Sequence, residues 1–170
     1  MEKYDWSRFT RRIDIYAPFE RLKYAWTTQS GLEAWFLRSA QFSSFEGERI
    51  PPEQTVKPGD QYDWLWHGWP DTTQESGVML ETSNPEILKF SFGGEATHPI
   101  IVTVSLKVEH VVSVLELTQE NIPDTEDARV NYHLGCCEGW GFYLVNLKSF
   151  LEGGIDLRNK NVSMENMINK

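Results

Sequence analysis

Apolar and polar residues alternate over several segments of the chain, and a period of two is typical of β-strands with one buried face. The clearest alternation runs over residues 100–109. Its apolar face carries four aliphatic side chains: Val102, Val104, Leu106 and Val108. The pattern predicts seven strands, over residues 9–16, 38–45, 59–67, 72–81, 87–92, 100–109 and 111–119. One dry and one wet face per strand indicate an antiparallel sheet that is covered on one side.

Two short helices are predicted after the first strand, over residues 18–28 and 32–36, with a break at Ser30-Gly31. Pro18 suits the first turn of a helix, where a missing N–H costs no hydrogen bond. The apolar positions of the first helix recur at helical spacing: Leu22, Ala25 and Trp26. A short helical pair therefore connects the first strand to the second.

A long helix is predicted over residues 132–151, where three- and four-residue spacing replaces the alternation. Its apolar stripe consists of Leu134, Trp140, Tyr143, Leu144, Leu147, Phe150 and Leu151. Gly153-Gly154 is a fitting C-terminal stop, and the polar run 121–129 before the helix is predicted to be a loop. Twenty helical residues would be about 30 Å long, close to the diameter of a small domain.

These elements together predict an α+β fold, in which a curved antiparallel sheet of about six to seven strands packs around the long C-terminal helix. The sheet has a dry face that needs a cover, and the helix offers an apolar stripe. A chain of 170 residues fits one domain, which we place at residues 1–158, followed by a polar tail over 159–170. A mostly apolar cavity is expected between sheet and helix.

Charge and cysteine content narrow the range of partners. The formal net charge of −9 disfavours nucleic acid, because binding to phosphate backbones depends on Lys and Arg. No segment approaches the roughly 18–20 apolar residues of a membrane span, and the N-terminus lacks a signal-peptide pattern, so no membrane insertion is expected. The two cysteines, Cys136 and Cys137, are adjacent and poorly placed for a disulfide. We therefore expect a cytoplasmic protein.

Candidate catalytic and metal-binding residues are few. The histidines show no spacing that groups metal ligands, so we expect no metal and separate surface or rim positions for His67, His98, His110 and His133. No glycine-rich nucleotide motif occurs, and we expect no cofactor. Cys136 and Cys137 point about 100° apart on a helix, which favours a packing role over a reactive pair. Four carboxyl groups could provide acid–base chemistry if buried, but their positions indicate solvated charges: Asp63, Glu75, Glu81 and Glu95.

Aromatic and aliphatic side chains gather on the faces that are predicted to point inward. They either fill the core or wall a ligand pocket, and the pattern leaves both possibilities open. Tyrosine hydroxyls and tryptophan N–H groups could supply the few polar contacts of such a pocket. The predicted cavity residues are Tyr62, Trp64, Trp66, Phe90, Phe92, Val104, Leu115, Trp140, Tyr143, Leu144 and Leu147.

Four groups of residues resemble the activator of heat-shock-protein-90 ATPase homologue family, within the START-like (SRPBCC, Bet v-like) helix-grip superfamily. They are Ala17-Pro18 with Leu22, Ala25-Trp26-Thr27, Gly31-Leu32 and Trp35-Phe36; Gly59 with Tyr62, Trp64 and Trp66; Asn84-Pro85 with Leu88, Phe90 and Phe92; and Gly139-Trp140 with Leu144, Leu147-Lys148 and Leu151-Glu152-Gly153. The resemblance covers roughly residues 8–158. It implies a helix-grip fold with a deep cavity between the sheet and the last helix.

The resemblance implies little about activity, because the superfamily contains lipid carriers, cyclases, hormone receptors and chaperone regulators. We rank first the binding of a small apolar or amphipathic ligand in the cavity. Second is a surface-mediated regulator of a chaperone or another protein partner, and third a cyclase-like enzyme. The known chaperone activators have an additional N-terminal domain for which this chain has no room, so we expect no strong ATPase stimulation. We expect a monomer or a homodimer.

Overall fold

The computed structural model describes residues 4–82, 87–95, 97–110, 112–164 and 167–169. In this part of the chain seven strands are present: β1 (Phe9–Asp14), β2 (Ser39–Ser43), β3 (Gln61–Leu65), β4 (Gln74–Glu81), β5 (Ile87–Glu95), β6 (His98–Glu109) and β7 (Val112–Glu120). The helices described are α1 (Phe19–Thr27), α2 (Gln29–Trp35), α3 (Glu126–Ala128), the π-helical segment η1 (Arg129–Gly135) and α4 (Cys136–Gly153).

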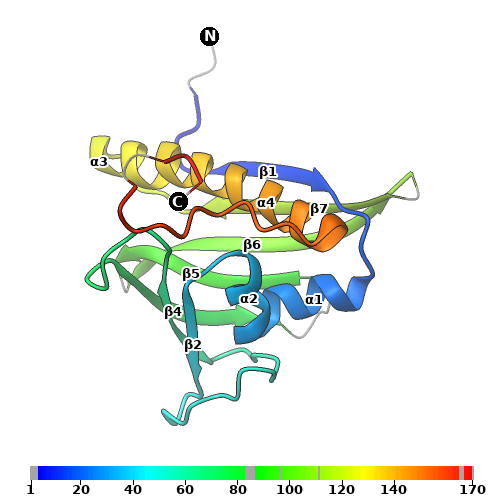
Figure 1. Cartoon of the computed structure of the whole chain (residues 1–170). Coiled ribbons are helices and arrows are strands. Elements are labelled where there is room, and N and C mark those ends of the chain that lie inside the picture. Colours follow the sequence, from blue (N-terminus) through cyan, green and yellow to red (C-terminus); the bar gives the residue numbers. More distant parts are fainter. Residues whose placement is uncertain (1–3, 83–86, 96, 111, 165–166, 170) are drawn as a thin grey trace.

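The strands form one antiparallel sheet in the order β1-β7-β6-β5-β4-β3-β2. The helices α1, α2 and α4 lie on the same side of this curved sheet, with α4 running along it (Figure 1). Side chains such as Phe90, Val102 and Leu117 are fully buried on the covered face, as the alternation predicts. Asn84-Pro85, part of the family resemblance, lies outside the described residues. The predicted α+β helix-grip fold is confirmed.

The two short helices are separated at Thr28 and not at the predicted Ser30-Gly31. Thr28 caps α2, because its Oγ1 accepts a hydrogen bond from the Gly31 backbone N–H at 2.9 Å. Gly31 lies inside α2, where a Cβ would come within 2.1 Å of the Tyr24 carbonyl oxygen. This glycine therefore allows α2 to pack closely against α1 and does not end a helix.

The C-terminal helical region begins at Glu126, inside the segment 121–129 that the sequence predicts to be a loop. Thr125 provides the cap, since its Oγ1 accepts a hydrogen bond from the Ala128 backbone N–H at 3.2 Å. Gly154 ends α4 in the left-handed conformation, with φ of 72°, as the glycine pair predicts. No helix in the described part of the chain is long and apolar enough to cross a membrane.

The π-helical segment η1 corrects two sequence predictions. Its wider turn changes which side chains face the sheet. Leu134, predicted in the apolar stripe, is 53% exposed, whereas His133, predicted at the surface, is 1% exposed. The His133 ring fits inside because both nitrogens have partners, the Trp6 carbonyl oxygen and the Tyr4 hydroxyl, each at 2.9 Å.

Strand β5 continues past its predicted end at Phe92 through two glycines. Gly93 and Gly94 have positive φ angles of 71° and 83°, which residues other than glycine rarely adopt. The pairing with β6 shifts register between Ser91 and Gly94. The resulting bulge bends the end of β5, where the strand passes beneath η1 and meets the ring of Tyr132.

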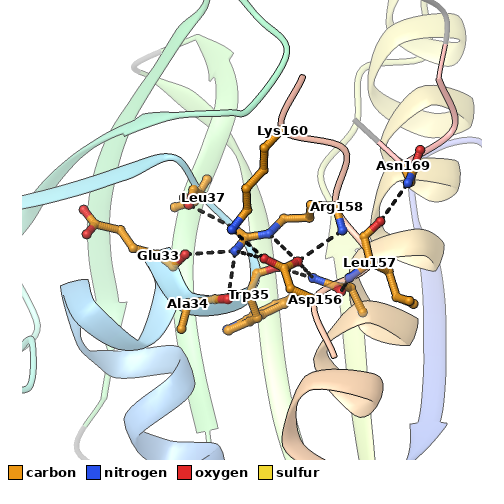
Figure 2. A network of polar contacts seen from close by, with 10 residues as sticks. Glu33, Ala34, Trp35, Leu37, Asp156, Leu157, Arg158, Lys160 and Asn169 are labelled. Carbon is orange, nitrogen blue, oxygen red and sulfur yellow. Dashed lines mark hydrogen bonds and ion pairs between the residues drawn. The ribbon is translucent and has the colours of Figure 1, made fainter. Parts of the chain in front are cut away.

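Beyond α4 the chain is tied to the end of α2 by Asp156 and Arg158, which we call the Asp156–Arg158 clasp (Figure 2). The Arg158 side chain is 1% exposed, and its Nε and Nη2 donate to the two Asp156 carboxylate oxygens at 2.9 and 2.7 Å. The guanidinium also donates to the carbonyl oxygens of Leu37, Glu33 and Ala34, at 3.0, 3.0 and 2.8 Å. It therefore satisfies the carbonyl groups of Glu33 and Ala34 in the last turn of α2, where carbonyls lack a helical partner, and that of Leu37 just beyond the helix.

Asn146 connects the clasp to α4 and to the end of α2. This fully buried side chain donates from Nδ2 to the Trp35 carbonyl oxygen at 2.5 Å and to Asp156 Oδ1 at 3.3 Å. Burial alone would raise the pKa of Asp156, but hydrogen bonds from Arg158 and Lys160 outweigh it and hold the pKa well below its ordinary value. The clasp is therefore a charged pair at neutral pH.

Candidate functional site

A pocket of about 420 Å³ opens between the end of α2, the β3–β4 connection, β5 and the first turns of α4. Six aromatic side chains wall it: Phe36, Trp66, Trp69, Phe92, Trp140 and Tyr143. Met167 and Ile168, from the C-terminal segment, line its exposed rim. Small-molecule sites are typically clefts of about 300–1,000 Å³ with mostly apolar walls, and this pocket has both properties.

The floor of the pocket is a set of aromatic rings in mutual contact. The Phe36 ring centroid lies 4.7 Å from that of Tyr143 and 5.1 Å from that of Trp140. Phe92 lies 5.7 Å from Trp140 and 6.3 Å from Trp66. These four pairs have interplanar angles between 36° and 82°, so the ring faces point in several directions. A rigid floor of differently oriented rings results.

Two glycines keep the helical wall of the pocket open. Gly139 lines the pocket, and apart from the backbone of its own helix a Cβ there would have no atom within 4 Å. Gly135, one turn earlier, also lines it, and a Cβ there would meet only the Val130 carbonyl oxygen, at 3.4 Å. Glycine inside a helix costs about 1 kcal/mol relative to alanine. The open space next to Gly139 is therefore obtained at the expense of helix stability.

A buried polar chain fixes the Trp140 ring. Its Nε1 donates to Gln119 Oε1 at 2.9 Å, and Gln119 Nε2 donates to the Tyr132 carbonyl oxygen at 3.0 Å. Gln119 is fully buried, so this bond is protected from water. The indole N–H of Trp140, which the sequence suggests as a ligand contact, is thus already occupied by the protein.

Burial changes the ionisation of two residues in the pocket wall. It raises the pKa of the Tyr143 phenol to about 12 and that of the Cys136 thiol to about 11. Both groups are therefore neutral at physiological pH. Among the described residues, no group of three His, Cys, Asp or Glu side chains could hold a metal ion.

Glu75 and Glu81 of β4 are half-buried, which corrects their prediction as solvated charges. Asp63 and Glu95 are exposed, as predicted. Burial raises the pKa of the Glu75 carboxyl, although a hydrogen bond from the Gly93 backbone N–H at 2.6 Å lowers it in part. Burial is the main cause of the raised pKa of Cys136, and the negative charge of Glu75 raises this pKa further. Glu75 is therefore a carboxyl group with a raised pKa close to Cys136, although it does not line the pocket itself.

The residues predicted to line a cavity separate into three groups. Four of them wall the pocket: Trp66, Phe92, Trp140 and Tyr143. Val104 and Leu115 line a second, smaller cavity of about 50 Å³ beside α1. The remaining residues are packed in the core: Tyr62, Trp64, Phe90, Leu144 and Leu147. Contact of any of these residues with a ligand stays a prediction.

Sequence reasoning missed several residues of the pocket wall. Phe36 was expected only as part of a short helix, and Trp69 lies between two predicted strands, 59–67 and 72–81. Met167 lies in a segment predicted to be a tail. Gly139 carries one available signal, since a glycine within a long apolar helix that is not a terminus usually has a packing reason. Phe36, Trp69 and Met167 belong to no periodic pattern that indicates a pocket.

Known proteins that match this chain share its architecture. The family model described as Activator of Hsp90 ATPase homolog 1-like protein matches residues 16–152. A search of curated proteins finds no match. The solution structure of the Aha1 dimer from Colwellia psychrerythraea is 18% identical, with a TM-score of 0.66 over 86% of this chain and 97% of that one.

Two further solved structures have the same fold. A protein from Cytophaga hutchinsonii, solved in solution, is 22% identical, with a TM-score of 0.60 over 91% of this chain and 98% of that one. DynU16, from the dynemicin biosynthetic locus, is 14% identical, with a TM-score of 0.65 over 91% of this chain and 50% of that one. At these identities the similarity shows the fold alone.

Proposed function

Because this chain belongs to the Activator of Hsp90 ATPase homolog 1-like family and contains an aromatic pocket, we propose that it binds a small apolar or amphipathic molecule between its sheet and α4. The observation that supports this most directly is the open space beside Gly139, inside a wall of aromatic rings. The pocket is open to solvent, and its walls are mostly apolar. A ligand that covers these walls would remove apolar surface from water, which is favourable.

A pair of glycine substitutions tests the proposal. Gly139→Phe places a ring in the pocket, whereas Gly141→Phe adds the same ring to the same helix outside the pocket wall. Both remove a helix glycine, and neither Cβ meets a neighbouring atom, so both variants should fold. We expect the neutral probe Nile red to bind the Gly141→Phe variant like the unchanged protein. We expect the Gly139→Phe variant to bind at least tenfold more weakly.

Native mass spectrometry of freshly purified protein gives an independent measurement. Extra mass that is lost on denaturation would support an occupied pocket, and the released molecule would identify the ligand class. Equal Nile red binding by the two phenylalanine variants, without any extra mass, would contradict the proposal. The pocket would then be a surface hollow without a binding role.

Regulation of a protein partner is the second candidate, and the match to a family described as activators of a chaperone ATPase favours it. In this case the functional surface would lie outside the pocket. Addition of the purified protein to an Hsp90 ATPase assay measures the activity directly. Stimulation that survives in the Gly139→Phe variant would support this second candidate over ligand binding.

Three further features belong to the proposal. We place the domain at residues 1–158 with 159–170 as a tail, although Met167 and Ile168 of that tail reach the pocket rim. We propose a cytoplasmic location, which the free thiols of Cys136 and Cys137 favour. Similarity to a dimer solved in solution makes a homodimer an alternative to a monomer, and light scattering distinguishes the two.

A further inference from the structure

The walls of the pocket combine ring faces with a negative charge. Six aromatic side chains surround it, and among the described residues that line it Glu138 is the one charged side chain. Aromatic rings have a negative face, so a cage of differently oriented rings attracts a cation. Alkylated ammonium groups fit such cages well, because their charge is spread over an apolar surface.

The geometry of the rings meets this requirement. Trp66 and Phe92 are inclined by 82°, and Phe92 and Trp140 by 53°, so a ligand would meet ring faces and edges from several sides. Trp69 is 55% exposed at the rim, where it could cover a bound group. Trp66 and Phe92 are only partly buried, which leaves part of each ring accessible from the pocket.

Nearby basic side chains are paired with carboxylates. Arg158 and Lys160 both pair with Asp156, at 2.7 and 2.8 Å, and every guanidinium nitrogen of Arg158 has an acceptor. Arg38 pairs with Asp71. None of these side chains lines the pocket. The described lining therefore offers no basic partner for a phosphate or carboxylate of a ligand.

Resting on the proposed binding function, we propose that the pocket selects an organic cation: an alkylated ammonium group joined to an apolar body, held against the aromatic walls with Glu138 as its counter-charge. The half-buried Glu75 adds a second carboxyl group near this wall. We commit to a free cation and not to a zwitterionic lipid head group, because the latter would bring a phosphate toward Glu138.

An isosteric pair of ligands separates charge from shape. Benzyltrimethylammonium and neopentylbenzene have the same outline and differ in the replacement of N⁺ by carbon. Each is titrated into isotopically labelled protein while the signals of Gly139 and of the tryptophan indole N–H groups are followed by NMR. We expect the cation to bind about tenfold more tightly, which corresponds to 1.4 kcal/mol. The neutral compound would bind more tightly if apolar burial alone decided affinity.

Two variants locate the effect. Glu138→Gln should reduce the ratio of the two affinities at least threefold, and Gly139→Phe should weaken both ligands. Dodecyltrimethylammonium and dodecylphosphocholine, each below its micelle concentration, then compare a free cation with a lipid head group. We expect the first to bind more tightly.

The outcomes distinguish the two proposals. If both isosteres shift the pocket signals with equal affinity, or the neutral one binds more tightly, the cation preference is wrong while the binding function stands. Tighter binding of dodecylphosphocholine would likewise contradict the commitment to a free cation. If none of the four compounds shifts a pocket signal, both the binding function and the cation preference are wrong.

Discussion

Replacing Arg158 with methionine should strongly destabilise the fold, because the side chain satisfies several buried groups at once. Methionine keeps the apolar stem and removes the guanidinium. The change leaves the Asp156 carboxylate without its bidentate partner and the carbonyl groups of Glu33, Ala34 and Leu37 without a side-chain donor. All of these groups lie next to a side chain that is 1% exposed, so water cannot replace the guanidinium without opening the structure.

The expected loss follows from that burial. Removing one partner of a buried ion pair typically costs about 3–5 kcal/mol. We expect Arg158→Met near the lower end of this range, because Asp156 is 21% exposed and keeps Lys160 as a partner. Domains of this size have a total stability of about 5–15 kcal/mol, and each 1 kcal/mol lowers the Tm by roughly 2–4 °C. We therefore expect the Tm to fall by about 6 °C or more.

Urea denaturation, followed by tryptophan fluorescence, measures the loss as a lower midpoint at unchanged slope. Lys160→Met is the matched control, because Lys160 also pairs with Asp156 but its side chain is 53% exposed. Exposed pairs contribute about 0–1 kcal/mol, so this control should change little. An Arg158→Met loss below about 1 kcal/mol, or equal to that of Lys160→Met, would refute the assignment of the clasp as a stabilising element.

Two other predictions concern ionisation in the pocket region. Burial raises the pKa of Glu75 above its unfolded value of about 4.3, so its contribution to stability is full below that pH and is lost as pH rises through the folded pKa. Glu75→Gln should therefore gain stability over the unchanged protein as pH rises from 4 to 8; a Tm difference that does not vary with pH would contradict this. Burial also raises the pKa of Cys136 to about 11. In a Cys137→Ser variant, Cys136 should react with iodoacetamide at pH 8 on the order of tenfold or more slowly than a free thiol, as measured by mass spectrometry; an equal rate would refute its burial.

The amino-acid pattern predicts the order of elements and the inward face along most of the sheet; Val108, predicted on the apolar face of β6, is an exception, because it is 74% exposed near the end of that strand. Alternation over β6 and β7 correctly placed Val104 and Leu115 inside, because a strand side chain can point only to one of two faces. Helical spacing likewise placed Leu147 on the buried side of α4. Both periods are local properties of the backbone, so they can be read without knowing what packs against them.

Irregular backbone limited this prediction. The π-helical turn of η1 exchanged the positions of His133 and Leu134, because an added residue per turn rotates the helix face. Glu75 looked like a solvated charge on an alternating strand. The bulge at Gly93 brings a backbone N–H to its carboxylate and helps to cover it. Neither feature has a periodic signal in the sequence.

The boundary between the core and the pocket depends on how distant segments pack together. Trp64 and Trp66 are two residues apart and face the same side, yet Trp64 is fully packed and Trp66 walls an open space. Both rings contact Phe36 and Phe92, and Trp64 also contacts Phe42, Tyr62 and Phe90, whereas Trp66 shares the pocket wall with Gly139, which has no side chain. Volume left empty between segments distant in sequence depends on how all of them pack together, and no local pattern encodes it.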